Sequence, residues 1–390
     1  MRIILCIRDL LASTGGPPRS VCGLADGLVQ RGHSVSILAG HWDGHPKGTV
    51  YPASDKIDIC WFKMHRIPGL NGAFSPDVLE RFLELKPDCQ TIVHDNGPWF
   101  LFSHSIARVA EKNSIPLVFS PRGNLTEWAF RYRGWKKRLC WSLYVKRDVN
   151  SAAVVHATSE REMTDLWKIG VSRPVALVSN AADLPLEDAC ANHDVAKSHR
   201  RALFLSRIHA KKGLLMLLEA WHQVRPMNWR LSIAGIDEDG YWGVVKQKII
   251  NLGLDKDVDY IGSVYGEDRQ NVYKSADLFV FPSYTENYGL VIAEALASCL
   301  PVITTTGTPW REIKELNCGW WIEPTVGAVT EALRAAVELS PGERRAMGDR
   351  GRKLIAENHS WDSASERMEQ VYKWVLNKGA CPDFVFPAPI

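Results

Sequence analysis

Short apolar runs alternate with amphipathic segments along the chain. Residues 2–7 (RIILCI) form an apolar run of strand length, and residues 34–40 (SVSILAG) form a second one. Between them, apolar residues recur from 21 to 29 with the three- and four-residue spacing of one helix face. A strand, a helix and a strand joined in this way predict a parallel sheet.

The same alternation continues in two blocks. Further strand-like runs lie at 91–95, 116–120, 152–158, 175–180, 201–207, 231–235, 259–264, 276–283, 301–306 and 320–324. A polar stretch without a clear period, about 186–200, separates the blocks and is typical of a linker. We therefore predict an α/β protein with two doubly wound parallel-sheet domains, an N-terminal domain at 1–190 and a C-terminal domain at 200–360. An amphipathic helix follows at about 362–376, and the Pro-broken last residues are expected to form a loose tail.

Composition limits the class of protein. The chain of 390 residues is long enough for two cores, and its net charge of +3 argues against a chain-wide nucleic-acid surface. The nine cysteines form no CxxC pair, which predicts reduced thiols and a cytoplasmic protein. The apolar run at the N-terminus is too short for a signal peptide, and no run approaches the roughly 18 apolar residues of a membrane-spanning helix.

The stretch TENYGLVIAEAL at 285–296 places two carboxylates, Glu286 and Glu294, after a strand-like run. Eight residues advance a helix by about 800°, roughly 80° beyond two turns, so the two would not share one helix face. Gly289 therefore predicts the helix start, with Glu286 on the preceding loop. The first amides of the helix favour a phosphate, and carboxylates accept hydrogen bonds from sugar hydroxyls. The pattern indicates a nucleotide-sugar site; a surface cap and a surface helix carboxylate are the alternative.

A second segment supports this interpretation. SRIHAKKG places Arg207 and Lys212 just after the first strand of the second block. Two cations at the end of a parallel strand are suited to bind a diphosphate and to stabilise it as a leaving group. A solvated basic turn is the alternative.

In this order the segments resemble the family-4 retaining glycosyltransferases of the GT-B fold. The motifs are R-x4-K-G at 207–213, E-x7-E at 286–294 and P-V at 301–302. The resemblance covers most of the chain and is strongest from 201 to 321. It implies two Rossmann-like domains that face a central cleft, with the C-terminal helix crossing back to the N-terminal domain.

The resemblance also implies roles, carried over by position. Arg207 and Lys212 would neutralise the donor diphosphate, Glu286 would contact the transferred sugar, and Glu294 would bind the ribose hydroxyls. The other donor-binding residues that we expect are Gly15, Gly16, Asn287, Tyr288, Gly289, Leu290, Ser263 and Val264. The two N-terminal glycines correspond to the family's glycine loop, which lets the backbone approach a phosphate.

The N-terminal domain resembles bacterial polysaccharide-type members. Residues 94–99 (HDNGPW) are similar to their strand-end segment H-x-H-G-x-W, so either His94 or Asn96 is expected to contact the donor sugar as a catalytic residue. Trp99 and Arg122, the latter within SPRGNL, are expected on the acceptor side. An arginine that bonds loop carbonyls is the alternative for Arg122.

Residues 131–147 contain seven basic residues and no acidic one, with Trp135, Trp141 and Tyr144 among them. Such a stretch can lie on an anionic membrane surface. Single-stranded nucleic acid, and a solvated helix whose aromatic residues face the core, are alternatives. We favour the membrane, which would place a cytoplasmic protein peripherally at the cytoplasmic face of the inner membrane.

The implied function is retaining transfer of a sugar from a UDP- or GDP-sugar to a hydroxyl of a glycan acceptor. The acceptor is expected to be a lipid-linked oligosaccharide in the synthesis of O-antigen, capsule or exopolysaccharide. Arg207, Lys212 and the helix dipole supply the charge of a metal, so we expect neither metal nor other cofactor. The D-x-D segment at 257–259 is interpreted as a surface turn. A nucleotide-sugar epimerase of the same fold and a non-catalytic nucleotide-sugar or lipid-binding protein are the alternative functions.

Overall fold

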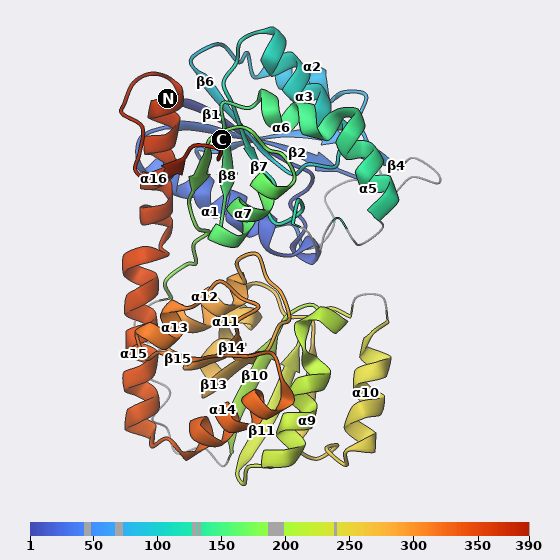
Figure 1. Cartoon of the computed structure of the whole chain (residues 1–390), viewed down its shortest axis with the longest axis vertical. Coiled ribbons are helices and arrows are strands. Elements are labelled where there is room, and N and C mark those ends of the chain that lie inside the picture. Colours follow the sequence, from blue (N-terminus) through green and yellow to red (C-terminus); the bar gives the residue numbers. More distant parts are fainter. Residues whose placement is uncertain are drawn as a thin grey trace. The chain divides into compact units, whose positions relative to one another are not determined.

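A computed structural model describes residues 1–42, 48–66, 73–126, 130, 134–185, 199–237 and 240–389 (Figure 1). The chain forms two compact units, one of Met1–Asn180 with Trp361–Ile390 and one of Ala181–Ser360. Each unit is built on one mainly parallel sheet flanked by helices. The predicted α/β fold with two doubly wound domains is therefore confirmed.

The sheet of the first unit has the strand order β16-β9-β8-β7-β6-β1-β2-β3. Its strands are β1 (Arg2–Ile7), β2 (Ser34–His41), β3 (Asp58–Lys63), β6 (Thr91–Asn96), β7 (Leu117–Ser120), β8 (Val154–Ala157), β9 (Val175–Leu177) and β16 (Val385–Phe386). All neighbouring strands from β3 to β9 pair in parallel. The sheet runs 3-2-1 and continues with β6 on the other side of β1, which is the order of the Rossmann fold. The strand order reverses between β1 and β6.

Helices cover this sheet, and the C-terminal helix is one of them. The helices of the first unit are α1 (Gly16–Gln30), α2 (Val78–Glu84), α3 (Leu101–Lys112), α5 (Gly134–Cys140), a π-helical turn η2 (Trp141–Val145), α6 (Lys146–Ser151), α7 (Glu160–Lys168) and α16 (Trp361–Val375). Helix α16 packs closely on α1, because a Cβ on Gly23 would lie 2.1 Å from the Trp361 ring. Arg31 Nε also bonds Glu369 Oε2 at 2.6 Å.

The sheet of the second unit has the order β12-β11-β10-β13-β14-β15, again that of the Rossmann fold. Its strands are β10 (Arg200–Leu205), β11 (Trp229–Ala234), β12 (Val258–Gly262), β13 (Leu278–Phe281), β14 (Val302–Thr305) and β15 (Gly319–Ile322). Its helices are the short η4 (Ala210–Lys212), α9 (Leu214–Val224), α10 (Trp242–Asn251), α11 (Gly266–Ser275), α12 (Leu290–Ala297), α13 (Glu312–Glu315), α14 (Val326–Glu338) and α15 (Pro341–Asn358). Here the order reverses between β10 and β13.

Several local expectations need correction. The tail is not loose throughout, since Val385 and Phe386 form β16 and pair antiparallel with β9. Strand β3 and a short hairpin of β4 (His65–Arg66) and β5 (Ala73–Phe74) were not predicted. The linker ends before residue 200, which already belongs to β10, and residues 186–198 lie outside the described part.

The cysteine prediction is also wrong in one respect. Seven cysteines are free thiols, namely Cys6, Cys22, Cys60, Cys89, Cys140, Cys318 and Cys381. Cys299, however, forms a disulfide bond, and its partner lies outside the described residues. Not all nine cysteines are therefore reduced.

Candidate functional site

The reversal of strand order in the second unit brings two distant loops together. Strands β10 and β13 are neighbours in the sheet, and their carboxyl ends lead to the loops that carry Arg207 and Glu286. The Tyr284 amide donates to the Lys211 carbonyl at 2.9 Å, which ties the two loops to each other. Ligands of open α/β sheets bind at such a point.

Lys212 and Glu286 form an ion pair across these loops. The Lys212 ammonium bonds Glu286 Oε1, and the two side chains are 6% and 13% exposed. Ser283 Oγ donates to the same carboxylate oxygen at 2.9 Å. Burial acts to raise the pKa of Glu286, but Lys212, Lys211 and the two hydrogen bonds hold it below its usual value. The carboxylate is thus ionised and fixed in place.

Gly213 explains how Lys212 is held there. Its φ of +73° is a left-handed conformation, and a Cβ at this position would lie only 2.0 Å from the Pro282 carbonyl oxygen. Only glycine therefore lets the end of η4 approach β13 so closely. The glycine of the R-x4-K-G motif has a structural role here.

Helix α12 begins where the sequence predicted. Gly289 is its N-cap with φ 80°, and Leu290 is its first residue. Glu286 lies ahead of the helix, and its amide donates to the Gly307 carbonyl at 2.8 Å. The Tyr288 side chain is buried and its hydroxyl lies 3.3 Å from His359 Nδ1, so only the backbone of Tyr288 could contact a donor. At Tyr288 the predicted donor contact would thus be a backbone contact, and the contacts at Asn287, Gly289 and Leu290 stay predictions.

Glu294 has a partner that the sequence did not reveal. Arg269 of α11 bonds Glu294 Oε2 through Nε at 3.1 Å and through Nη2, and the Tyr273 hydroxyl donates to the same oxygen at 2.7 Å. The Arg269 and Glu294 side chains are 14% and 18% exposed. No motif marks Arg269 or Tyr273, although their spacing of four residues places them on one face of a helix. Ser263 and Val264 follow β12 at its carboxyl end, Ser263 exposed and Val264 half-buried.

In the first unit the glycine loop follows β1 as expected. Gly15 has φ 100° and is the N-cap of α1, which begins at Gly16 with prolines in its first turn. A Cβ built on Gly16 would meet nothing within 4 Å. Gly15 is therefore required by the turn, whereas the space beside Gly16 is open.

His94 is part of the core. Its side chain is buried, Nδ1 lies 2.7 Å from the Tyr372 hydroxyl, and His156 Nδ1 lies 3.3 Å away from its Nε2. His156 Nε2 bonds the Val178 carbonyl at 2.8 Å, and since a carbonyl only accepts, the chain of donors runs from Tyr372 and His94 toward His156 and Val178. Burial lowers the pKa of both rings, that of His156 to about 3. This geometry gives His94 a packing role, and contact with a donor sugar would require these bonds to break.

Asn96 is held just as firmly. Its Nδ2 donates to the carbonyls of Cys6 at 3.1 Å and His94 at 3.0 Å, and its Oδ1 accepts from Arg122 at 2.9 and 2.8 Å. Arg122 has a left-handed φ of 51° and also donates to Asn180 Oδ1 at 2.5 Å. Arg122 thus joins the ends of β6 and β9 and bonds side-chain amides, whereas loop carbonyls were the expected structural partners.

Trp99 follows β6 at the same edge of the sheet, and its side chain packs against neighbouring residues. Its Nε1 donates to the Asn124 carbonyl at 3.1 Å, and its ring contacts Phe130 edge-on with centroids 5.5 Å apart. The side chain is half-buried. Its predicted role on the acceptor side remains a prediction.

Arginines pair with both carboxylates of the D-x-D segment. Asp257 pairs with Arg225, and Asp259 pairs with Arg230. Among the residues that the structure describes, no three His, Cys, Asp or Glu side chains are grouped to hold a metal ion. Within the same residues no helix has the length and apolar character needed to cross a bilayer. Metal independence itself stays a prediction.

Two family profiles match successive parts of the chain. The profile described as Glycosyltransferase Family 4 matches residues 14–185, and that described as Glycosyl transferases group 1 matches residues 190–354. Among solved structures, sucrose-phosphate synthase from Thermosynechococcus elongatus superposes with a TM-score of 0.77 at 19% identity, covering 97% of this chain and all of that one. Anabaena HepE in complex with UDP and glucose has a TM-score of 0.73 at 17% identity, with 95% and 99% covered.

Curated relatives agree. Mannosylfructose-phosphate synthase of Agrobacterium fabrum is 32% identical over 336 residues, 75% of this chain and 72% of the relative. A GDP-mannose:cellobiosyl-diphosphopolyprenol alpha-mannosyltransferase of Xanthomonas campestris is 24% identical over 216 residues, 55% of each. An uncharacterized glycosyltransferase of Methanocaldococcus jannaschii is 30% identical over 185 residues, and the match spans about half of either protein, 46%. The chain therefore belongs to the family-4 glycosyltransferases and has their GT-B fold.

Proposed function

We propose that the protein transfers a sugar, with retention of anomeric configuration, from a UDP- or GDP-sugar to a hydroxyl of a glycan acceptor. The Lys212–Glu286 ion pair ahead of the start of α12, whose lysine follows β10 on the loop that also carries Arg207, is the observation that carries the proposal. It supplies cations for a diphosphate and a fixed carboxylate for a sugar hydroxyl at the reversal of the sheet.

The donor diphosphate would be bound by the second unit. An ammonium has three N–H donors, so Lys212 can hold Glu286 and a phosphate oxygen together. Arg207 adds a second cation, and the amides at the start of α12 add partial positive charge. These groups would stabilise the charge that develops on the diphosphate as it leaves, which is the role that a metal has in other sites.

The transfer breaks the bond between the anomeric carbon and the diphosphate oxygen and forms a bond from that carbon to the acceptor oxygen. The acceptor proton passes to an oxygen of the departing diphosphate on the same face of the sugar. Glu286 would orient the transferred sugar and Glu294 would bind the ribose. Proximity of the two substrates supplies much of the rate in such a step.

A lipid-linked oligosaccharide of a bacterial surface polysaccharide is the acceptor that we favour. The support is the polysaccharide-type segments at 94–99 and around Arg122, together with the name of the Xanthomonas relative, a mannosyltransferase that acts on a diphosphopolyprenol-linked sugar. The HepE complex with UDP and glucose supports a nucleotide-sugar donor. Such an acceptor would bring the enzyme to the cytoplasmic face of the inner membrane.

Nucleotide release separates the candidate functions. The purified protein is mixed with a panel of UDP- and GDP-sugars, with and without detergent-solubilised lipid-linked glycans, and free nucleotide and products are measured. A transferase releases nucleotide together with an extended glycan, and retention is read from the anomeric proton coupling of the product. Release of nucleotide together with an epimerised free sugar, without an acceptor, would instead support the epimerase, and binding without release would support a non-catalytic protein.

A further inference from the structure

One helix of the first unit has two apolar faces. Helix α5, the π-turn η2 and helix α6 run on from one another over residues 134–151, with α-helical dihedral angles at Cys140, Val145 and Lys146. Trp141, Tyr144, Val145 and Val149 pack into the core of the unit. The three aromatic residues singled out in the sequence are thus split, because Trp141 and Tyr144 face inward and Trp135 faces outward.

The outer face carries a row of large apolar side chains. Trp135 is 70% exposed, Leu139 is 52% exposed and Leu143 is 69% exposed. They follow one another at intervals of four residues, which places them along one side of a helix. Each residue of the wider π-turn rotates about the helix axis by a smaller angle than a residue of an α-helix. Leu143 therefore lies on the same side as Leu139. Exposing such a row to water stabilises nothing in the fold.

Basic residues flank this row. Arg138 and Lys146 are exposed, Lys136 is half-exposed, and residues 134–147 contain no acidic side chain. Lys136 Nζ lies 5.5 Å from the Trp135 ring, whereas Lys137 Nζ lies 5.6 Å from the Trp99 ring and Arg147 pairs with Glu111. We call the row and the three cations Lys136, Arg138 and Lys146 the basic–apolar face; residues 131–133 lie outside the described part.

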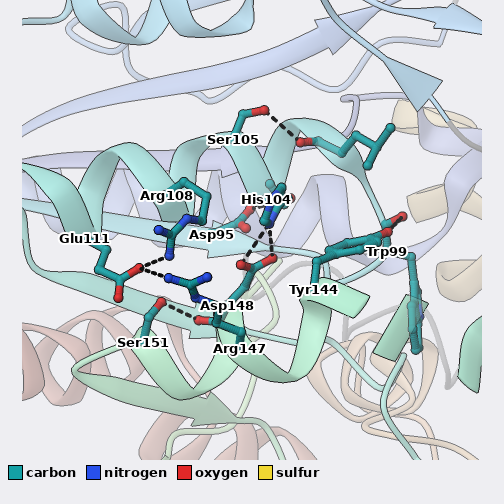
Figure 2. A network of polar contacts seen from close by, with 12 residues as sticks. Asp95, Trp99, His104, Ser105, Arg108, Glu111, Tyr144, Arg147, Asp148 and Ser151 are labelled. Atoms are coloured by element: carbon teal, nitrogen blue, oxygen red, sulfur yellow. Dashed lines mark hydrogen bonds and ion pairs between the residues drawn. The ribbon is translucent and has the colours of Figure 1, made fainter. Parts of the chain in front are cut away.

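The inner side of the helix is fixed by a polar network (Figure 2). Asp148 of α6 bonds His104 Nδ1 of α3 at 2.8 Å, and the Tyr144 hydroxyl donates to the Trp99 carbonyl at 3.2 Å. Glu111 of α3 pairs with Arg108 and lies 3.9 Å from Arg147 Nη2. These contacts therefore hold the helix that carries the outer row against the rest of the unit.

We propose that the basic–apolar face binds the surface of an anionic phospholipid bilayer, with Trp135, Leu139 and Leu143 inserted at the level of the headgroups. A helix that has a large apolar row beside lysines and arginines fits this interface, and its charge complements anionic lipid. Single-stranded nucleic acid is less suited, because base stacking needs a platform of aromatic rings, and of the aromatic residues described at 134–147 only Trp135 faces outward. The proposal names a partner for the proposed function, but it stands without any catalytic activity.

Vesicle binding tests this face directly. The full chain is mixed with vesicles of phosphatidylcholine alone or with one third phosphatidylglycerol, and the bound fraction is measured by flotation at low and high salt. Two variants are compared with the unaltered protein, the triple variant Trp135→Ala, Leu139→Ala, Leu143→Ala and a charge variant that combines Lys136→Gln, Arg138→Gln and Lys146→Gln. Leu83→Ala and Met227→Ala, which truncate residues 55% and 88% exposed elsewhere, are the matched controls.

We expect binding to the anionic vesicles only, with a loss of at least about tenfold in either variant and none in the controls, since each cation near such a surface contributes about a factor of five. Salt should weaken binding of the unaltered protein. The proposal is overturned if the unaltered protein does not bind, if it binds both vesicles equally, or if the controls lose as much as the variants. A face that instead captures a single-stranded oligonucleotide, or a dimer that the triple variant abolishes, also overturns it.

A separate observation concerns Arg269. Its guanidinium and the Tyr273 hydroxyl both bond Oε2 of Glu294, and Arg269 lies 5.8 Å over the Tyr273 ring. Two bonds from a planar guanidinium and one from a hydroxyl restrict the rotation of the carboxylate. Arg269 is thus itself oriented by the residue four positions later on α11.

We infer that Arg269 is a positioning residue, which orients the Glu294 carboxylate toward the ribose hydroxyls of the donor. The inference rests on the proposed function, in which Glu294 binds that ribose. Arg269→Leu would leave the Glu294 side chain less ordered, whereas Arg269→Lys keeps a charge beside it without the two-bond geometry. Tyr273→Phe removes one hydrogen bond to the same oxygen and should have a smaller effect than Arg269→Leu.

The readout is discrimination between ribose and deoxyribose. Affinities for UDP, GDP and their 2′-deoxy counterparts are measured by calorimetry with the unaltered protein and the three variants. We expect the unaltered protein to prefer the ribonucleotide, Arg269→Leu to lose at least about tenfold of that preference while its affinity for the deoxynucleotide is kept, and Arg269→Lys to recover part of it. An unchanged preference, or an equal loss for both nucleotides together with a lower Tm, overturns the role. No nucleotide binding by the unaltered protein would overturn the proposed function itself.

Discussion

Lys212 and Glu286 are 74 residues apart in the chain, yet their side chains form a buried ion pair at the point where the strand order of the second sheet reverses. The pair links the R-x4-K-G segment with the E-x7-E segment. Two motifs that the sequence presents separately are therefore parts of one site.

Breaking this pair should affect both stability and activity. Lys212→Met or Glu286→Gln leaves one buried charge without the opposite charge that compensates it. We expect each to cost about 3 kcal/mol or more of unfolding free energy. Both should lower kcat by orders of magnitude, because both groups act on the donor. Chemical unfolding and nucleotide-release assays measure the two effects.

The double variant Lys212→Met, Glu286→Gln distinguishes function from folding. Without an uncompensated charge, it should recover most of the lost stability but none of the activity. Near-normal turnover in a well-folded double variant would contradict the site.

The two kinds of glycine should respond differently to alanine. Gly213→Ala places a Cβ where the Pro282 carbonyl is and at a left-handed φ, so we expect a loss of several kcal/mol and a displaced Lys212. Gly16→Ala meets no protein atom within 4 Å, so its Tm should not fall. If a donor phosphate approaches this loop, Gly16→Ala should still raise the KM for the donor about tenfold. An unchanged KM would remove Gly16 from the donor site.

The buried histidine pair predicts a pH dependence. The pKa of His94 and that of His156 are lowered in the fold, so both rings take up protons near pH 6.5 only when the chain unfolds. Stability that is present above pH 6.5 should therefore be lost as the pH falls toward 3, by up to about 1.4 kcal/mol per pH unit for each ring. Urea unfolding at a series of pH values measures this slope.

The control for this prediction is the double variant His94→Asn, His156→Asn. It should be less stable at pH 7, because Tyr372 loses its acceptor, yet its stability should change less between pH 6.5 and 5. An equally steep slope in this variant would assign the acid sensitivity to other groups.

A substitution of Arg122 distinguishes a purely structural role from a role in acceptor binding. Arg122→Lys cannot reproduce the bonds to Asn96 and Asn180, so we expect some loss of stability in either case. If Arg122 also contacts the acceptor, the KM for the acceptor should rise at least about tenfold while hydrolysis of the donor in its absence is unchanged. Equal effects on both reactions would leave Arg122 a purely structural residue.

The periodicity of the chain was sufficient to predict the sheets, because parallel strands are buried on both faces and appear as continuous apolar runs such as RIILCI and ADLFVFPS. Strand β3, with the sequence DICWFK, was missed since it lies at the sheet edge, where most of its side chains are half-buried or exposed. Strand β16 was missed because only two residues pair with β9.

At the candidate site, the sequence located the residues on loops but not their partners. Gly289 indicated the start of α12 in the sequence, and in the structure it is the N-cap residue with a left-handed backbone that glycine adopts readily. The role of His94 could not be foreseen, since its acceptor and donor come from β8 and from α16, 278 residues away in the chain. Arg269 gave no signal, because an arginine in a surface helix is ordinary until its neighbour Glu294 is known.

The central claim is that the second unit binds a nucleoside diphosphate through Arg207, Lys212 and Glu294. The most direct test is a crystal structure of the protein soaked with UDP or GDP, whichever calorimetry shows to bind. We expect phosphate oxygens within hydrogen-bonding distance of Arg207 and Lys212, and the ribose hydroxyls on Glu294. A nucleotide bound elsewhere, with these three side chains unchanged and untouched, would contradict the account.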